Sequence, residues 1–345
     1  MKTKLFNASD YQAAAKLLRQ GELIAFPTET VYGLGADALN EEAVKKVYAV
    51  KGRPSDNPLI VHVDNVQRIR PFVQSFPTNT QLLVDTFWPG PLTLIFKVKP
   101  GLFSKTVTGG LDTVAFRMPN NQQTLNLIKA ADTPLVGPSA NTSGKPSPTT
   151  AVHVLHDLQG KIAGVLDDGP TAIGVESTVL DLTGIDGIPV ILRPGAVTQE
   201  ALAQVIGQIA IDQHLLTAKE APKAPGMKYK HYAPDVPVWI VEGKAPAFAE
   251  ALQQAQQQNK AVGLFVEEQL AAEFANEAKT IVSFGEGTVE QATKQLFAGL
   301  RSLDDEQSID LIFAQGFPET GLGSAYMNRL KKAANQKKVE KDSIF

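Results

Sequence analysis

Short apolar runs and helical stretches alternate irregularly through the first 200 or so residues. A helix is predicted over residues 11–20, where Asp10 can cap it and Gly21 can end it, and a second over 41–52 after Asn40. Apolar runs typical of buried strands lie at residues 23–26, 59–63, 91–98, 113–118, 162–167, 177–182 and 190–193. So many strands with irregularly placed helices predict an α/β domain with one mixed, twisted open sheet, rather than a strict βαβ repeat.

Beyond Pro237 the pattern becomes regular. The apolar runs VPVWIVEG, AVGLFV, AKTIVSF and IDLIFAQG are separated by helical stretches rich in Ala, Gln and Glu. This alternation predicts a smaller, doubly wound parallel sheet of the Rossmann-like kind. The composition changes between the two regions, at AKEAPKAPG. We therefore expect a domain over residues 1–207, a linker over 208–235 and a second domain over 236–345.

Composition excludes several classes of protein. The 345 residues are 43% hydrophobic with a net charge of −3, so no overall positive field attracts nucleic acid. The chain has no cysteine, which excludes disulfides, thiolate zinc sites and cysteine nucleophiles. The N-terminus lacks an apolar signal region and no apolar run is long enough to span a bilayer. We expect a cytoplasmic protein without a membrane partner.

The segment PTETVYGLGADA places Thr28, Glu29 and Thr30 just past a predicted strand. These side chains either line a pocket or cap the next turn. The glycines at 33 and 35 satisfy a variant of the dinucleotide-binding fingerprint. The predicted strand, however, ends several residues before the first glycine. The glycines are better interpreted as relaxing a loop.

Cations and small donors gather in other loops. Lys51 and Arg53 precede two prolines at a helix end, where they suit a polyphosphate or simply favour the helix C-terminus. His62, on the next strand, is either a core histidine or a substrate ligand. The hydroxyl-rich run GPSANTSGKPSPTT fails the P-loop spacing, but its donors, which enter a helix at Pro148, can still bind an anion.

Two arginines at strand ends, Arg117 and Arg193, suggest a pocket that clamps phosphate and carboxylate. Asp167 and Asp168 either help to hold Mg²⁺ or form a turn.

An ordered set of motifs resembles the threonylcarbamoyl-AMP synthase family in its two-domain form, with a YrdC-like N-terminal domain. The matching stretches are FPTETVYGLGADA, KGRPSDNPLIVH, FWPGPLT, GLDTVAFRMP, PSANTSGKPSPTT, GVESTVLDL, LRPGA, APGMKYKHYAP and GFPETGLGSAYMNRLKKA. No motif position departs from the family pattern.

The resemblance implies a nucleotidyltransferase reaction. Threonine and bicarbonate give N-carboxythreonine, whose new carboxylate attacks the α-phosphorus of ATP and releases pyrophosphate. The resemblance implies Mg²⁺ with ATP, no organic cofactor and no stable nucleic-acid binding. Other proteins then receive the threonylcarbamoyl-AMP for modification of the adenosine beside the anticodon of ANN-decoding tRNAs.

The resemblance also assigns site residues, none of them a covalent nucleophile. Those expected around threonine or its carbamate are Thr30, His62, Arg117, Gly137 and Ser177. Those expected to contact ATP are Lys51, Arg53, Asn57, Thr113, Ser139, Asn141, Ser147, Arg193 and Tyr232. The linker motif APGMKYKHYAP either folds back over ATP, with Tyr232 at the nucleotide, or only joins the two domains.

Two rival functions remain open from the residues alone. The basic stretch LKKAANQKKVEK and the lysines of the linker suggest an RNA-binding module, although the near-neutral net charge speaks against it. The glycine pair and the C-terminal alternation suggest a dinucleotide-dependent oxidoreductase, but the glycines are misplaced for that role.

Overall fold

The computed structural model describes residues 2–55, 57–184, 187–212 and 231–339. The chain divides into two compact units. The first holds most of the described residues up to Asp212. The second holds the described residues from His231 onward together with Gly144–Pro146 and Ile173–Val175. Among the described residues, no helix is both long and apolar enough to cross a membrane.

The first unit is built on an eleven-stranded mixed sheet with the strand order β1-β8-β2-β3-β7-β4-β6-β5-β9-β10-β11. Its strands are β1 (Lys4–Asn7), β2 (Ile24–Phe26), β3 (Gly33–Asp37), β4 (Ile60–His62), β5 (Leu92–Lys97), β6 (Thr113–Arg117), β7 (Leu135–Val136), β8 (Gly164–Asp167), β9 (Thr178–Asp181), β10 (Val190–Arg193) and β11 (Ala210–Ile211). The sheet combines parallel pairs such as β4–β6 with antiparallel pairs such as β5–β6. The predicted mixed sheet is therefore confirmed. Because β11 pairs with β10, the sheet extends past residue 207, where the sequence pattern ended the first domain.

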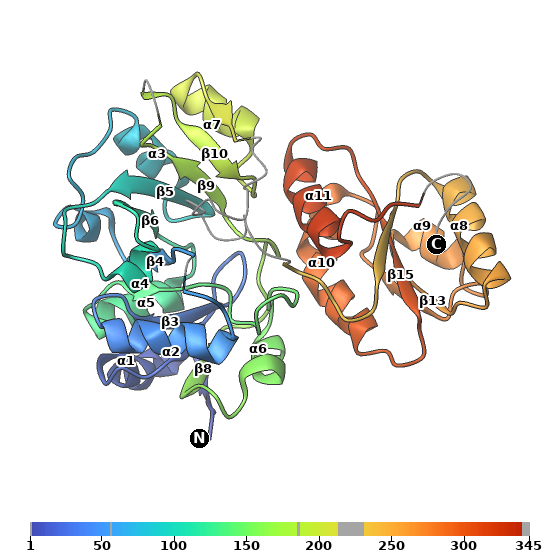
Figure 1. Ribbon diagram of the computed structural model, residues 1–345, viewed down its shortest axis with the longest axis horizontal. Helices are drawn as coiled ribbons and strands as arrows, with labels where there is room; N and C mark the ends of the chain where they lie inside the picture. Colours follow the sequence, from blue (N-terminus) through green and yellow to red (C-terminus); the bar gives the residue numbers. More distant parts are fainter. Residues whose placement is uncertain (1, 56, 185–186, 213–230, 340–345) are drawn as a thin grey trace. The chain divides into compact units, whose positions relative to one another are not determined.

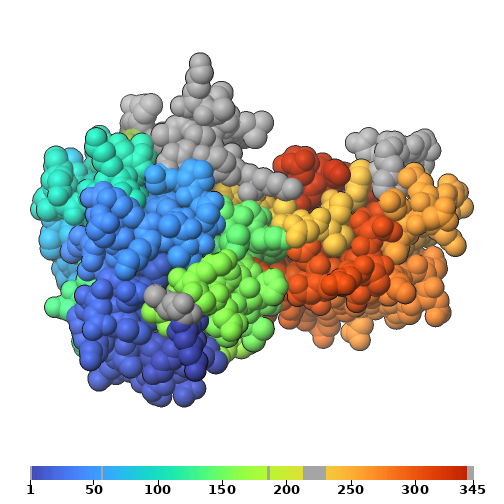
Figure 2. Space-filling view, turned by 60° about the horizontal axis from the view of Figure 1, so that its bottom comes forward, coloured from blue at the N-terminus to red at the C-terminus, as the bar shows by residue number. Residues whose placement is uncertain are grey.

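Helices surround this sheet (Figure 1). They are α1 (Tyr11–Arg19), α2 (Glu41–Lys51), α3 (Thr80–Phe87), α4 (Lys105–Thr108), α5 (Gln122–Ala131), α6 (Ala151–Leu158) and α7 (Gln199–Ile206). The side chain of Asn40 accepts the Ala43 N–H to start α2, and Gly52, with φ of 62°, ends it. The start of the chain lies beside its middle, because β1 pairs with β8. In Figure 2, the blue atoms of the N-terminal part lie beside the green atoms of the middle of the chain.

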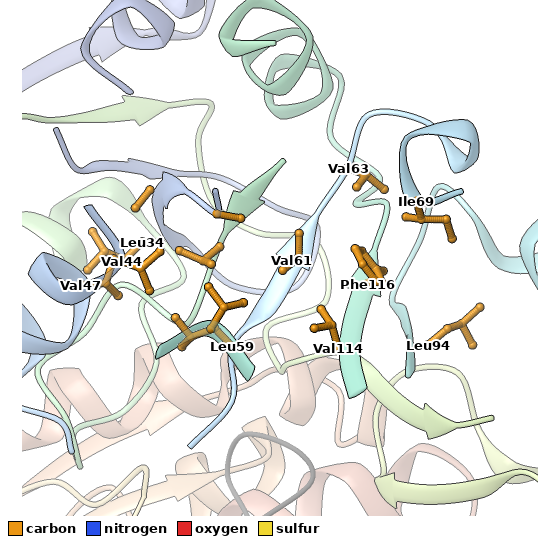
Figure 3. Close-up of a cluster of buried hydrophobic side chains, with 14 of the residues drawn as sticks. Leu34, Val44, Val47, Leu59, Val61, Val63, Ile69, Leu94, Val114 and Phe116 are labelled. Atoms are coloured by element: carbon orange, nitrogen blue, oxygen red, sulfur yellow. The ribbon is translucent and has the colours of Figure 1, made fainter. Parts of the chain in front are cut away.

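Alternation along the central strands sends successive side chains to two faces of the sheet. One face packs in the main core, and the other combines polar side chains with a small apolar cluster of Ile60, Ile95, Ala115 and Val179. Val61, Leu94 and Phe116 point into the main hydrophobic cluster of the first unit, which Figure 3 shows. Their neighbours in sequence, such as His62 and Arg117, point to the opposite face. We call this opposite face of β4, β6, β5, β9 and β10 the site face.

The glycine pair of PTETVYGLGADA lies within strand β3, so the prediction of a loop is wrong. A Cβ on Gly33 would lie 2.8 Å from Cζ of Phe26, and one on Gly35 would lie 2.7 Å from the carbonyl oxygen of Ile24. Glycine is needed here because β2 packs too closely for any side chain.

The second unit contains a four-stranded sheet with the order β12-β15-β13-β14, and all its strand pairs are parallel. Its strands are β12 (Val238–Val241), β13 (Val262–Val266), β14 (Thr280–Ser283) and β15 (Leu311–Gln315). Its helices are α8 (Ala245–Gln257), α9 (Glu268–Glu273), α10 (Val289–Asp304) and α11 (Leu322–Ala333). In Figure 1, α8 and α9 cover one face and α10 and α11 the other. The predicted doubly wound parallel sheet is confirmed.

Candidate functional site

Polar side chains of β4, β6, β5 and β10 form a row across the site face, in which β9 contributes the apolar Val179. His62 of β4 lies opposite Arg117 of β6, which lies opposite Thr93 of β5. Thr93 is paired with Val179 of β9, and Val179 with Arg193 of β10. Since paired residues on neighbouring strands share a face, the sheet register itself brings these groups together.

A β-bulge brings Arg193 into this row. The register shifts between Ile191 and Arg193, so that β10 has one residue more than β9 at this point. Strict alternation would send Arg193 to the same face as Ile191, which packs in the main core. The extra residue turns the arginine toward the site face instead.

Arg193 is held at the end of the row by Ser177. Its Nε and Nη2 donate to the Ser177 carbonyl oxygen at 3.0 and 2.9 Å, and Nη2 also reaches the Ser177 hydroxyl at 3.2 Å. That hydroxyl shares a 2.8 Å hydrogen bond with the hydroxyl of Thr93. Ser177, which is predicted at threonine, therefore contacts Arg193, which is predicted at ATP.

Arg117, at the middle of the row, lies against a buried carboxylate. Its Nη2 is 2.7 Å from Oε2 of Glu29. Despite this distance, neither atom has a hydrogen bond of acceptable geometry within the described residues. We regard the contact as a charge pair, because the distance is short while the orientation is poor for a hydrogen bond. Nε of Arg117 points at the Gly90 carbonyl oxygen at 3.4 Å.

His62 is a neutral, buried ring beside Arg117. Burial, and then the positive charge of Arg117, lower the pKa of His62 to about 3. Its Nδ1 has no hydrogen-bond partner within the described residues. Gly137 lies against the ring, because a Cβ there would stand 2.6 Å from Nδ1. The imidazole can therefore exchange hydrogen bonds with a ligand without adding charge.

The Lys51 ammonium lies on the hydroxyl-rich loop that follows β7. It donates to the Asn141 carbonyl oxygen at 2.7 Å and to the Ser139 carbonyl oxygen. The Ser143 N–H in turn donates to the Lys51 carbonyl oxygen at 2.9 Å. Arg53 is buried just beyond, with its guanidinium 5.9 Å from the Tyr48 ring centre. The structure thus brings together the Lys51–Arg53 loop and the hydroxyl-rich loop, each of which the sequence analysis considered separately as an anion site.

Other predicted residues are also buried in the first unit. Asn57 is fully buried, and neither atom of its amide group has a partner within the described residues. The Ser147 hydroxyl donates to Glu176 at 2.5 Å. Thr30 shares a 2.8 Å hydroxyl contact with Thr28, and Thr113 is buried at the start of β6.

Three further sequence interpretations concern Asp167 and Asp168, the linker motif and Tyr232. Asp167 accepts hydrogen bonds from the Tyr32 hydroxyl and, across a turn, from the Gly169 N–H at 3.0 Å. Asp168 accepts the Asn121 amide at 2.8 Å, a contact between distant segments. A role of either carboxylate at Mg²⁺ stays a prediction. Within the linker motif, residues 224–230 lie outside the described part of the chain. Tyr232 belongs to the second unit, where its ring centre lies 5.2 Å from that of Phe297. Its contact with ATP stays a prediction.

Sequence reasoning missed one residue of the site, Thr93, and one pairing, that of Glu29 with Arg117. Thr93 lies within the apolar run PLTLIFKV, where a lone polar residue on an inward-facing strand position was the available signal. Glu29 was singled out, but its pairing with Arg117 depends on tertiary structure and has no local signal.

Fold and site define an α/β protein of two units, whose larger unit gathers cations and hydroxyls on one face of a mixed sheet. A family model described as "Telomere recombination" matches residues 16–195, and one described as "Threonylcarbamoyl-AMP synthase, C-terminal domain" matches residues 197–335. The chain belongs to the threonylcarbamoyl-AMP synthase family, in its two-domain form.

Relatives support the membership over nearly the whole length. A threonylcarbamoyl-AMP synthase of Bacillus subtilis is 50% identical over 322 residues, covering 93% of this chain and 92% of the relative. One of Pyrococcus abyssi is 44% identical over 340 residues, covering 95% and 94%. The crystal structure of P. abyssi Sua5 complexed with L-threonine superposes with a TM-score of 0.91 at 42% identity, covering 98% of this chain and 100% of that one.

Proposed function

We propose that this chain makes threonylcarbamoyl-AMP from L-threonine, bicarbonate and ATP and releases pyrophosphate. Family membership along nearly the whole chain supports the reaction, and the relative of known structure binds L-threonine. The observation that carries the proposal within this structure is the row from His62 through Arg117 to Arg193. It supplies sites for a carboxylate and for phosphates on one continuous face.

In the proposed complex, the planar guanidinium of Arg117 binds the carboxylate of threonine. Thr30, His62 and Ser177 surround the rest of the amino acid. His62 takes part as a neutral ring, since its lowered pKa of about 3 excludes imidazolium near pH 7. The threonine nitrogen, after losing a proton to solvent, forms a bond to the carbon of bicarbonate. The bond from this carbon to the bicarbonate hydroxyl breaks, and the hydroxyl leaves as water with a second proton from the nitrogen.

ATP lies toward the cationic residues Lys51, Arg53 and Arg193. An oxygen of the carbamate forms a bond to the α-phosphorus while the bond from this phosphorus to the oxygen bridging the β-phosphate breaks. The electron pair leaves with pyrophosphate. Such a displacement depends on positioning and charge neutralisation, so it needs no nucleophile from the protein. The enzyme class proposed is therefore nucleotidyltransferase.

Mg²⁺ is proposed to arrive with the triphosphate. Over the described residues, no three His, Asp or Glu side chains are grouped so that they would hold a metal ion by themselves. Phosphate oxygens fit the hard cation best. Because the product feeds the modification of tRNA by other proteins, the cytoplasm is the proposed location, and those proteins are the proposed partners.

A direct test incubates the protein with ATP, Mg²⁺, ¹⁴C-bicarbonate and one amino acid at a time. Label is expected in an acyl-adenylate with threonine alone, together with one pyrophosphate per labelled product. Omission of ATP should abolish the labelled product. Label that is independent of the amino acid, or release of ADP in place of pyrophosphate, would contradict the proposal.

A further inference from the structure

Glu29 is unusual among the buried acidic residues of the first unit. Three acidic residues are buried in the described part of the first unit: Glu29, Glu176 and Asp181. Glu176 accepts the Ser147 hydroxyl, and Asp181 accepts the Thr183 N–H at 2.8 Å and the Thr183 hydroxyl at 2.6 Å. Glu29 differs, because both its carboxylate oxygens are buried without an acceptable hydrogen bond within the described residues.

A buried carboxylate without hydrogen bonds is costly unless something else compensates it. Arg117 provides charge compensation at 2.7 Å, but both Glu29 oxygens and Nη2 of Arg117 lack a hydrogen bond of acceptable geometry within the described residues. An ionised carboxylate accepts about four hydrogen bonds, and a guanidinium donates five. The pair is therefore set up to make further polar contacts on the site face.

The two charges match those of an amino acid. A zwitterion carries a carboxylate and an ammonium on the same carbon, and here a guanidinium and a carboxylate lie side by side. Binding of the substrate carboxylate at Arg117 brings its ammonium within reach of the neighbouring carboxylate. The resulting four charges alternate in sign, which is a favourable arrangement in a buried site.

We propose that Glu29 binds the α-ammonium of the amino-acid substrate while Arg117 binds its carboxylate. The proposal rests on the proposed function, because it names the group that selects an amino acid over other hydroxy acids at that site. A ligand without the amine would leave Glu29 with its hydrogen bonds unmade, and such a ligand is rejected for that reason.

Calorimetric titration of the full chain, without ATP, tests this with two ligands. L-Threonine carries the amine, and 3-hydroxybutyrate lacks it but keeps the carboxylate and the hydroxyl. The wild-type protein is expected to bind threonine about 100-fold more tightly, as for a charge-assisted hydrogen bond in a buried site. Glu29→Gln should reduce this preference to less than about fivefold, because the variant loses affinity for threonine. Its dissociation constant for 3-hydroxybutyrate should stay within a few fold of the wild-type value.

The matched control is Glu267→Gln, which removes a buried carboxylate from an ion pair with Lys244 in the second unit. It should keep the 100-fold preference. An unchanged preference in a folded Glu29→Gln protein would overturn the proposal while threonine binding, and the proposed function, stand.

Two other results are decisive. If Glu29→Gln does not fold, the test is the wild-type protein's affinity for threonine compared with its affinity for 3-hydroxybutyrate. Equal affinities for the two ligands would overturn the role of Glu29. If the wild-type protein binds no threonine under any condition, with or without ATP, the proposed function itself fails.

Discussion

Breaking the Glu29–Arg117 pair from one side is expected to destabilise the first unit strongly. The charged atoms are 2.7 Å apart and both side chains are buried. At an effective dielectric constant of about 20, two unit charges at that distance attract each other by roughly 6 kcal/mol. Desolvation of the ions offsets several kcal/mol of this attraction. Because the remaining charge is left buried, Arg117→Met and Glu29→Leu should each cost about 3–5 kcal/mol.

The chain contains a convenient reporter for this measurement. Its two tryptophans are Trp88, in the first unit, and Trp239, in the second. Trp88 is buried, and its indole N–H donates to the Leu92 carbonyl oxygen at 2.7 Å. In a Trp239→Phe background, urea unfolding followed by fluorescence therefore gives the free energy of unfolding of the first unit.

The double variant decides whether the reasoning holds. Glu29→Leu combined with Arg117→Met removes both charges and leaves apolar side chains, so its loss should be only about 1–2 kcal/mol. The single variants would then be coupled by several kcal/mol. A double variant whose loss equals the sum of the two single losses would refute the argument, because additivity means that the charges do not compensate each other.

Three further predictions concern the same unit. Gly137→Ala should cost about 1–3 kcal/mol, because its Cβ would stand 2.6 Å from Nδ1 of His62; an unchanged urea midpoint at Trp88 would count against this. The folded-state pKa of His62 is about 3, below the usual 6.5, so its stabilising contribution is full above pH 6.5 and is lost as the pH falls toward 3. His62→Gln should therefore flatten the pH dependence of unfolding between pH 7 and 4, and identical slopes would contradict it. Lys51→Ala combined with Arg53→Ala should raise the KM for ATP about tenfold or more with little change for threonine; an unchanged KM for ATP in steady-state assays would make the loop purely structural.

The sequence predicts the architecture well wherever burial shows as an uninterrupted apolar run. The strands around Val61 and Phe116 and the alternation of the second unit are visible in this way. Strand β3 was not predicted, because its glycines are typical of a loop. In the structure they are needed because the ring of Phe26 leaves no room for a side chain. Strands β7 and β11 have two residues each, too few for any periodic signal.

The site is predictable in residue type but not in partnership. Charged and hydroxyl residues at the ends of strands and of a helix indicated Arg117, Lys51 and Ser139 as candidates, and the structure places all three in buried or half-buried polar contacts. The pairing of Arg117 with Glu29 depends on how distant segments meet. The orientation of Arg193 depends on a β-bulge that has no recognisable signal in the local sequence.

The row across the site face also determines the stage of translation at which the complete site can form. It joins β4 to β10 through strands that are not neighbours in sequence, and its last cation is Arg193. Because a chain emerges from the ribosome starting at its N-terminus, a nascent chain that ends before Ser177 has His62 and Arg117 but neither Ser177 nor Arg193. Such a chain lacks the cation and the hydroxyl at the far end of the row. Complete binding capacity thus arises only once the last of these strands has paired, late in the formation of the first unit.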